Sequence, residues 1–363
     1  MLAVSLILLA GYIGWLLYEA YANRRARRSF RHVIHVSGIR GKTTTCRLID
    51  AHLRHAGFRV FTKTTGTQPV YIDTAGVEHP IRRPGLPNIA EQLSMLRRAR
   101  REGAEIVILE CMAVAPELQR VSQEKMVRGD WNVITNVRYD HIFEMGESLE
   151  EIAESLSAVI PADGVLFVGE ETFFPFFQER CRARGSEAVL CPGTGPAGSE
   201  NRAIACAIGA RLGVDPAAFP QAQEDYHADF GTCRCYDLGE RRFLDLFSAN
   251  DPQSSLQLLR ETFPEGGELT LIYNHRADRP DRLLLFLRHF FPQVPCRKVI
   301  VLGECRYLAR RLLHRAGVEQ VELAANWREA LEQADTPQIA GVGNIKGQAY
   351  QMIEYLERGE AHE

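Results

Sequence analysis

A strong net charge is absent from this 363-residue sequence, in which 43 Lys and Arg residues stand against 46 Asp and Glu residues, a formal net charge of -3. General nucleic-acid binding needs a positive field, so this balance argues against nucleic acid as a partner. Internal repeats and low-complexity tracts are also absent. The apolar (45%) and charged (25%) fractions are ordinary for a globular protein, so we do not expect extensive disorder. The length suits two or three domains.

The cysteines lack the spacing of a zinc site. There are nine, an odd number, and the two nearest to each other, Cys233 and Cys235, are separated by a single residue. The usual pair of zinc ligands is spaced C-x-x-C, which this pair is too close to match. We therefore expect reduced thiols, most of them buried as small apolar side chains.

Charged residues are missing from the first 18 positions, which are rich in Leu, Ile, Val, Tyr and Trp. Glu19 and the arginines at 24, 25, 27 and 28 follow this run. A helix of about 20 apolar residues spans the core of a bilayer. A secretory signal would carry its positive charges before the run. Because they follow it here, the positive-inside rule places the N-terminus outside and the rest of the chain in the cytoplasm. We predict a transmembrane anchor over residues 1–22 of a single-pass cell-membrane protein. The alternative is a buried helix of a soluble protein, since the run is short.

A glycine is missing where the standard P-loop begins, because Val36 stands five residues before Gly41. A shorter pattern, G-x-x-G-K-T, is present instead and begins at Gly38, directly after the apolar segment Val33–Val36. Such a turn offers backbone N–H groups and a helix N-terminus to phosphate, while its lysine reaches the outer phosphates and its threonine hydroxyl binds magnesium. We predict a nucleoside-triphosphate site; a glycine turn without a ligand is the alternative. Its residues are Gly38, Arg40, Gly41, Lys42, Thr43 and Thr44.

Strand-like and helix-like segments alternate from Arg31 to about Pro161, which predicts a parallel sheet covered by helices. The predicted strands are Val33–Val36, Arg59–Thr62, Ile106–Leu109, Trp131–Thr135 and Val165–Val168. The predicted helices are Thr43–Ala56, Ile89–Glu102, Leu149–Val159 and Glu200–Leu212, with Asn88 and Ser148 as N-caps.

The alternation restarts after residues 229–232 and predicts a second, smaller α/β domain of Rossmann-like type. Its predicted strands are Phe243–Phe247, Leu269–Tyr273, Lys298–Leu302 and Gln338–Val342. Its predicted helices are Ser254–Thr262, Asp281–Phe290 and Tyr307–Ala316. We therefore expect an anchor over 1–22, an ATP-binding domain over 30–228 and a C-terminal domain over 229–363.

Two polar groups follow predicted strands of the first domain. Glu110 ends the apolar run 106–109, and Asp140 with His141 follows the strand that ends at Thr135. Ligands of open α/β sheets gather at the carboxyl ends of the strands. A carboxylate oxygen suits Mg²⁺, and an oxygen and an imidazole side by side suit a second metal. A strand-end carboxylate that is merely solvated is the alternative for Glu110.

Together, these residues resemble the Mur-type amide ligases and their folylpolyglutamate synthase relatives. The glycine loop, Glu110 and the segment Thr135-Asn136-x-x-x-Asp140-His141 follow that family's order and spacing. Asn201 stands at the polar position of a segment similar to the family's adenine-side helix. In the C-terminal half, the similar segments are Asn250-Asp251-Pro252, Asn274-His275-Arg276-Ala277-Asp278-Arg279 and Gly343-Asn344-x-x-Gly347. The resemblance implies a P-loop ligase fold with a central Mur-like domain and a smaller C-terminal α/β domain.

The anchor and three local phrases resemble one branch of that family, the catalytic subunit of poly-γ-glutamate synthase of the CapB/PgsB type. The phrases are Lys63-Thr64-Thr65-Gly66-Thr67, Pro87-Asn88-Ile89-Ala90-Glu91-Gln92 and Glu110-Cys111-Met112-Ala113-Val114. One family feature is missing. Many members carry a carbamylated lysine that holds a second metal, whereas residues 154–160 here contain no lysine.

The resemblance implies an ADP-forming ligase that uses ATP and Mg²⁺ to add glutamate to a growing poly-γ-glutamate chain through an acyl phosphate. The resemblance implies that Lys42 binds the outer phosphates, that Thr43 and Glu110 bind the first magnesium ion, and that His141 binds a second metal. Asn201 and Arg276 would bind nucleotide. It also implies small membrane subunits of a synthase and export complex as partners, in addition to the bilayer. Another Mur-like or folylpolyglutamate-like ligase with a different acceptor, a membrane-tethered P-loop ATPase or kinase, and a non-catalytic nucleotide-binding scaffold remain open.

Overall fold

The computed structural model describes residues 2–66, 68–83, 85–196, 198–224, 233–264 and 268–360. They form two compact units. The first unit contains residues up to 137, residues 153–194 and residues 198–224. The second unit contains residues 138–152, 195–196, 233–264 and 268–360. The domain boundary expected at 228/229 lies outside the described residues.

The first unit is built on an eight-stranded sheet with the strand order β4-β3-β2-β5-β1-β6-β7-β8. Its strands are β1 (His32–Ser37), β2 (Val60–Lys63), β3 (Val70–Ile72), β4 (Glu78–Pro80), β5 (Ile106–Glu110), β6 (Trp131–Ile134), β7 (Val165–Val168) and β8 (Glu187–Leu190). Six strands are parallel, and β3 and β4 add an antiparallel edge. The central strands β1, β5 and β6 are buried along almost their whole length because helices cover both faces.

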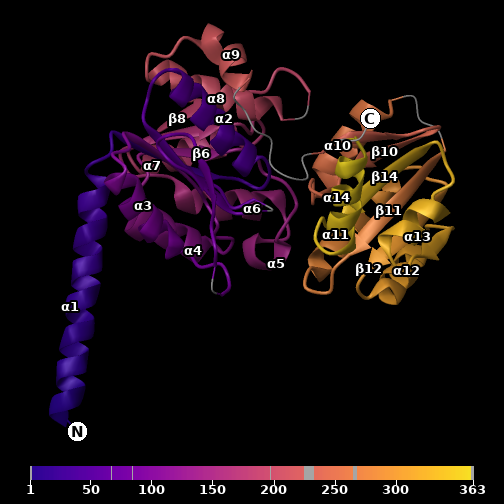
Figure 1. The fold of residues 1–363 in the computed structure, drawn as a ribbon, viewed down its shortest axis with the longest axis horizontal. Coiled ribbons are helices and arrows are strands. Elements are labelled where there is room, and N and C mark those ends of the chain that lie inside the picture. Colours follow the sequence, from indigo (N-terminus) through magenta and orange to yellow (C-terminus); the bar gives the residue numbers. More distant parts are fainter. Residues whose placement is uncertain are drawn as a thin grey trace. The chain divides into compact units, whose positions relative to one another are not determined.

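Helices cover both faces of this sheet (Figure 1). The helices of this unit are α1 (Leu2–Arg27), α2 (Lys42–His55), α3 (Glu91–Arg101), α4 (Pro116–Val121), the π-helix η1 (Ser122–Val127), α7 (Phe174–Ala183), α8 (Ser199–Arg211), the 3₁₀ turn Pro216–Ala218 and α9 (Phe219–Glu224). The helix α6 (Leu149–Leu156, continued by a 3₁₀ turn to Val159) begins in the second unit and ends in the first. Alternate residues of β1 and β5 point to opposite faces. Ile34 and Ile108 pack in the core beneath α2 and α8, whereas Val33 and Leu109 pack in the core beneath α3.

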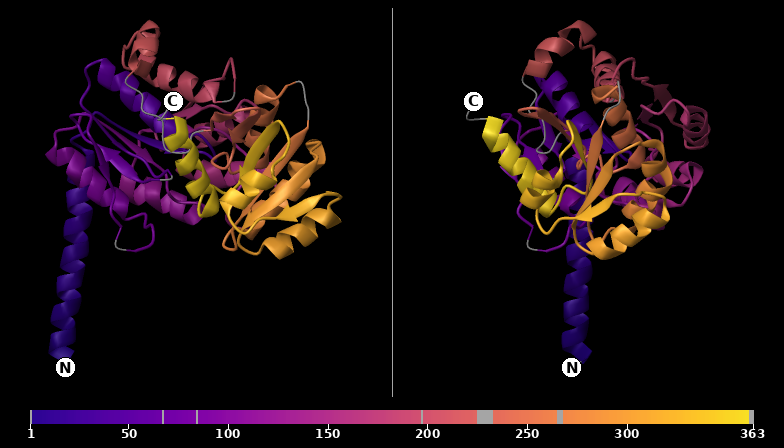
Figure 2. Two further views of the ribbon diagram at one scale, coloured as in Figure 1. Left: turned by 45° about the vertical axis from the view of Figure 1, so that its right-hand side comes forward. Right: turned by 90° about the vertical axis from the view of Figure 1, so that its right-hand side faces the viewer.

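The N-terminal part of α1 is exposed to solvent, whereas its last two turns pack against the rest of the first unit. In Figures 1 and 2, α1 extends away from the sheet of its own unit in every view. Near its end the Asn23 side chain donates to the Met126 carbonyl at 2.9 Å, and Arg27 pairs with Asp130 at 2.6 Å. Ala26 is fully buried. The helix is long and apolar enough to cross a membrane. Because length and composition are the only support for this, the membrane anchor remains a prediction.

The second unit contains a six-stranded sheet with the order β13-β12-β11-β14-β10-β9, in which only β9 is antiparallel among the described strands. Its strands are β9 (Cys235–Leu238), β10 (Arg241–Asp245), β11 (Leu269–His275), β12 (Lys298–Gly303), β13 (Val321–Leu323) and β14 (Gln338–Gly343). Its helices are α5 (Ile142–Met145), α10 (Pro252–Thr262), α11 (Pro280–His289), the 3₁₀ turn Phe291–Gln293, α12 (Arg306–Arg315), α13 (Trp327–Gln333) and α14 (Gln348–Glu360). Apolar cores lie on both faces of the sheet.

The predicted α/β fold is confirmed, and each predicted strand and helix is present with ends shifted by at most three residues. Ser148 caps α6, since its hydroxyl accepts from the Glu151 N–H at 3.1 Å. Asn88 accepts from the Ala90 N–H at 2.9 Å and so caps the turn that leads into α3. The short strands β3 and β4 were not predicted, because segments such as Glu78-His79-Pro80 have no apolar pattern.

Candidate active site

The glycine loop connects β1 to α2 and depends on two glycines with positive φ. Gly38 has φ +117°, and a Cβ atom there would lie 2.1 Å from the Thr135 hydroxyl oxygen. Gly41 has φ +77°, and its Cβ would lie 2.5 Å from Asn201 Oδ1. Only glycine fits such positions without strain. The loop is therefore held against β6 on one side and α8 on the other.

The end of β6 fixes the loop by hydrogen bonds. The Arg40 N–H donates to Asn136 Oδ1 at 2.9 Å, and the Thr135 hydroxyl donates to the Arg40 carbonyl at 2.5 Å. The Ile39 N–H donates to the Asn136 carbonyl at 3.3 Å. These contacts explain why the Thr135-Asn136 segment accompanies the loop: its side chains pre-form the phosphate-binding turn.

Lys42 and Thr43 begin α2 in the positions that the motif predicts. The Lys42 ammonium lies over the loop and donates to the Gly38 and Ile39 carbonyls at 2.8 and 3.1 Å. The Thr43 hydroxyl donates to Glu110 Oε2 at 2.9 Å. Glu110 ends β5 and is almost fully buried. The predicted pair of oxygen ligands is thus brought together by the neighbouring strands β1 and β5.

This pair fits a magnesium ion by its donor chemistry. A hydroxyl and a carboxylate are hard oxygen ligands of the kind Mg²⁺ takes in nucleotide sites, where phosphates and waters complete the shell. The described part of the chain contains no group of three or more His, Cys, Asp or Glu side chains placed to hold a metal. Mg²⁺ would therefore bind here together with nucleotide rather than in an all-protein cage.

Asn201 lies in the first turn of α8, beneath the loop. Its Oδ1 accepts from the Thr45 hydroxyl at 2.9 Å and lies 2.5 Å from the place that a Cβ atom of Gly41 would occupy. In this position Asn201 supports the glycine loop. A direct contact with nucleotide remains a prediction.

The segments that begin at Lys63 and at Pro87 meet behind Glu110. Glu110 Oε2 also accepts from the Thr65 N–H at 2.6 Å, and the Glu110 carbonyl accepts from the Gln92 side chain at 2.9 Å. Lys63 is fully buried and pairs with Glu91 at 2.8 Å. Burial lowers the pKa of the Lys63 ammonium, while the charges of Glu91 and Glu110 raise it. The sequence places these two segments where a substrate could lie across the sheet edge, with turn chemistry and an N-cap as the alternative; it predicts neither the Lys63–Glu91 pair nor the bonds to Glu110.

Asp140 and His141 lie in the second unit. Arg279, just before α11, donates to His141 Nδ1 at 2.9 Å. Because a guanidinium is always a donor, Nδ1 is the acceptor nitrogen and a neutral ring carries its proton on Nε2. A ligating histidine instead donates its second nitrogen to an oxygen and binds the metal through the other. A metal role for His141 would require this contact with Arg279 to change, and it stays a prediction.

Arg282 was missed by the sequence analysis. Its side chain is buried in the first turn of α11, and it pairs with Asp140 at 3.5 Å and donates to Asn250 Oδ1 at 2.7 Å. It also bonds Asn344 Oδ1. Arg282 therefore joins Asp140 to the family-like segments around Asn250 and Asn344 within the second unit. Arg276 pairs with Asp278 at 2.5 Å at the surface of this unit, and its contact with nucleotide stays a prediction.

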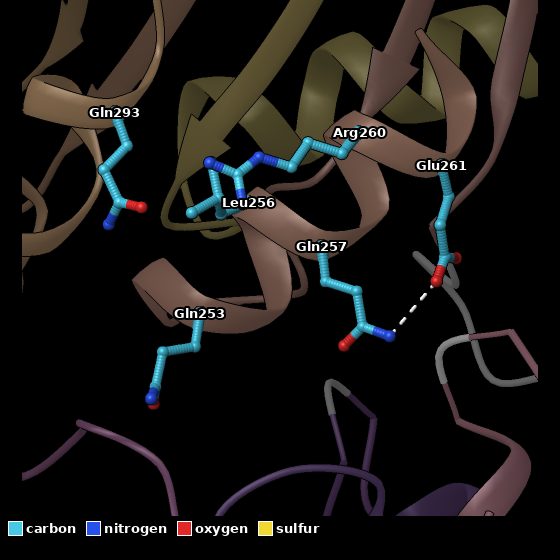
Figure 3. Close-up of a pocket in the computed structure, with 6 residues that line it drawn as sticks. All are labelled: Gln253, Leu256, Gln257, Arg260, Glu261 and Gln293. Atoms are coloured by element: carbon cyan, nitrogen blue, oxygen red, sulfur yellow. Dashed lines mark hydrogen bonds between the residues drawn. The ribbon is translucent and has the colours of Figure 1, made fainter. Parts of the chain in front are cut away.

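A pocket of about 490 Å³ opens on α10 of the second unit (Figure 3). Four lining residues, Gln253, Gln257, Arg260 and Glu261, are polar residues of this helix, and Gln257 donates to Glu261 at 3.1 Å. Their amide and charged groups offer hydrogen bonds but no nucleophile. None of the predicted site residues lines this pocket.

Comparison with known proteins decides the family. Residues 36–189 match the Mur ligase middle domain, and residues 235–359 match the poly-gamma-glutamate synthase CapB C-terminal domain. The chain is 30% identical over 357 residues to the PGA synthase CapB of Bacillus subtilis, with 89% of each chain covered. The chain belongs to the CapB family. It is also 30% identical to the capsule biosynthesis protein CapB of Bacillus anthracis, over 94% of this chain and 79% of the relative.

The fold extends beyond CapB proteins. The solved structure of E. coli FolC in complex with ADP superposes with a TM-score of 0.69 at 17% identity, and the match covers 98% of both chains. At this identity the likeness establishes the fold alone. Because a CapB-family chain has the two-domain fold of FolC and Mur ligases, the predicted ligase fold is confirmed.

Proposed function

We propose that this CapB-family protein is an ATP-dependent amide ligase that makes poly-γ-glutamate, adding glutamate to the growing chain and releasing ADP and phosphate. The observation that carries the proposal is the Thr43–Glu110 pair beside a pre-formed phosphate loop, in a chain 30% identical to a PGA synthase. The loop supplies nucleotide binding, and the family supplies the reaction class.

The proposed reaction has two steps. An oxygen of the terminal carboxylate of the chain attacks the γ-phosphorus of ATP, and the bond to the β-phosphate oxygen breaks to leave ADP. The amine of glutamate then attacks the acyl carbon, the bond to phosphate breaks, and the nitrogen loses a proton. Catalysis of this kind rests on positioning and charge neutralisation.

The residues of the first unit act on the first step. The loop N–H groups and Lys42 bind the β- and γ-phosphates, which requires the ammonium to exchange its Gly38 and Ile39 carbonyl partners for phosphate oxygens. Thr43 and Glu110 would hold Mg²⁺, which neutralises phosphate charge when bound. Arg40 lies within the loop and can steady the phosphoryl group. We derive no step from a second metal, because His141 accepts from Arg279 and residues 154–160 contain no lysine.

The same proposal places the protein at the membrane. The exposed, uncharged part of α1 is the single span, the arginines that follow it face the cytoplasm, and both units work there. Small membrane subunits that carry the polymer outward are the proposed partners. Bilayer insertion of α1 is tested by protease protection of an N-terminal tag in sealed vesicles.

Turnover of the full-length protein in membranes tests the ligase. Truncation before Ser29 is unsuitable, because Ala26 packs in the core of the first unit. With ATP and Mg²⁺, we expect ADP release that depends on L-glutamate, D-glutamate or γ-linked glutamate oligomers, and products that grow by one glutamyl unit.

The matched variants are Lys42→Ala and Lys125→Ala, because Lys125 is an exposed lysine of the same unit. Lys42→Ala should lose ADP release by at least about a hundredfold while the protein remains folded, since one charged contact to the transferring phosphate is removed. Lys125→Ala should keep wild-type turnover. Undiminished ligation in the Lys42 variant would refute the proposal, and glutamate-independent ATP hydrolysis would favour a P-loop ATPase.

A further inference from the structure

An ion cluster with a fully buried lysine and two half-buried partners lies behind the carboxylate of Glu110. The Lys63 side chain is fully buried, and its ammonium is 2.8 Å from Glu91 Oε1. Arg83 donates to the same carboxylate, at 2.7 Å through Nε and 3.1 Å through Nη2. Two cations thus share the single negative charge of Glu91. Lys63, Arg83 and Glu91 together carry a net charge of one positive unit, and the Lys63 ammonium is shielded from solvent.

The cluster is built into the strand ends that carry the metal site. Lys63 of β2 is in register with Leu109 of β5, the residue before Glu110. The Thr65 N–H, two residues after Lys63, donates to Glu110 Oε2 at 2.6 Å. Gln92, the residue after Glu91, donates to the Glu110 carbonyl at 2.9 Å. Each partner of the ion pair therefore has a near neighbour in the chain that bonds Glu110 itself.

The Lys63 ammonium does not compete for the ligand side of Glu110. Because strand residues alternate between faces, Lys63 shares the face of Leu109 and reaches Glu91 in the first turn of α3. Glu110 points to the opposite face, where it meets Thr43 at the start of α2. The Lys63 ammonium and the Glu110 carboxylate therefore lie on opposite faces of the sheet edge. The two charges interact, since the Glu110 charge raises the pKa of Lys63.

A fixed positive charge at this place opposes a cation bound by Glu110. Charges separated by protein rather than water interact strongly, because the effective dielectric constant is low. The attraction between Glu110 and a divalent ion is therefore partly offset by Lys63. The Lys63 ammonium is itself shielded from solvent, since its side chain has no exposed surface.

We propose that Lys63 is a positioning residue that acts through Glu110 and sets the affinity of the site for Mg²⁺ by placing an ion-paired ammonium behind this carboxylate. The inference rests on the proposed function, since it concerns the same magnesium site. A weaker magnesium site would help a ligase because the Mg·ADP product would dissociate from it faster. Product release limits the turnover of many enzymes.

A binding measurement tests this without turnover. The affinity of the full-length protein for ADP is measured by calorimetry with Mg²⁺ and with EDTA, and the ratio of the two dissociation constants reports how strongly the site couples metal to nucleotide. We expect Lys63→Met to increase this ratio by at least about threefold, because one opposing charge is removed. Lys63→Arg keeps the charge and should restore the wild-type ratio.

Two further variants keep the test informative if Lys63→Met fails to fold. Arg83→Gln removes the second cation of the cluster and leaves the Lys63–Glu91 pair in place, so it should increase the ratio by a smaller factor. Lys125→Met removes an exposed lysine of the same unit and should leave the ratio unchanged.

The direction of the change separates the explanations. A purely structural Lys63 would misplace Glu110 when it is lost and lower the ratio, and that result, or an unchanged ratio in both Lys63→Met and Arg83→Gln, overturns the inference. If Mg²⁺ does not change the ADP affinity of the wild-type protein, the proposed magnesium site itself is refuted.

Discussion

Replacing Gly38 by alanine tests the geometry of the phosphate loop most directly. The added Cβ would lie 2.1 Å from the Thr135 hydroxyl oxygen and 2.7 Å from the Thr135 backbone nitrogen. Neither group can move freely. The hydroxyl donates to the Arg40 carbonyl at 2.5 Å, and the Thr135 N–H donates to the Ser37 carbonyl at 3.1 Å. The clash therefore falls on the backbone of β6 or of the loop.

The expected cost follows from three effects. A non-glycine residue at positive φ costs about 1–2 kcal/mol. Overpacking of a closed site costs about 1–3 kcal/mol. Loss of the bond from Thr135 to Arg40 adds about 1 kcal/mol. Together these effects predict a loss of about 3–6 kcal/mol, either as lower stability of the first unit or as a distorted loop.

Gly57→Ala is the matched control. Gly57 also has positive φ, +88°, but no atom lies within 4 Å of its Cβ position, so only the backbone cost of about 1–2 kcal/mol applies. Urea unfolding is followed by Trp131 of the first unit in a background that carries Trp15→Phe and Trp327→Phe. ADP binding is measured on the same proteins.

We expect Gly38→Ala to lose at least about 2 kcal/mol more stability than Gly57→Ala, or to bind ADP at least about thirtyfold more weakly, the equivalent of that free energy. Gly57→Ala should bind ADP as the wild type does. A Gly38→Ala protein that matches Gly57→Ala in both measurements would refute the packing of the loop against β6.

Two further predictions concern buried titratable groups, one in each unit. Burial lowers the pKa of His35 to about 4, so the unfolded chain binds the proton more readily and the stability of the first unit should fall as the pH drops from about 6.5 to 4, by up to about 3 kcal/mol. His35→Leu should remove this slope in urea unfolding followed by Trp131; an unchanged slope would contradict the assignment. Burial raises the pKa of Asp245 to about 7, so the folded state holds the proton and the stability of the second unit should fall as the pH rises from about 4 to 7. Asp245→Asn should therefore stabilise this unit by about 2–4 kcal/mol at pH 8 and leave it unchanged near pH 3; Trp327 fluorescence measures it, and equal stability of the two proteins at pH 8 would speak against a buried carboxylate.

The parts of the site that the sequence predicted well are those fixed by local pattern. A glycine turn between an apolar strand and a helix places Lys42 and Thr43 by the geometry of that turn alone. Glu110 was predictable because parallel strands bring their carboxyl ends to one edge, and β5 pairs with β1 there. Each of these inferences needs only the order of neighbouring elements along the chain.

The parts that escaped prediction depend on contacts between distant segments. Lys63 and Glu91 are separated by 28 positions, and their pairing follows from α3 packing beneath β2 and β5. Arg282 reads as one more polar residue of an amphipathic helix, whereas its burial beside Asn250 and Asn344 makes it the centre of a polar cluster. No pattern in the sequence distinguishes Arg282 from Arg276, which pairs on the surface.

The pair Asp140-His141 shows how a correct location can leave the chemistry open. The segment follows β6, as predicted, yet its side chains contact arginines: Arg279 donates to the imidazole, and Arg282 pairs with the carboxylate. For His141 to bind a metal through Nδ1, the bond from Arg279 must break. For it to bind through Nε2, the ring proton must move to Nδ1, where the guanidinium now donates. Either route replaces a guanidinium contact by a metal bond. The positive charge beside this pair is therefore supplied by arginine in the structure described, and a metal role for His141 requires the second unit to release it.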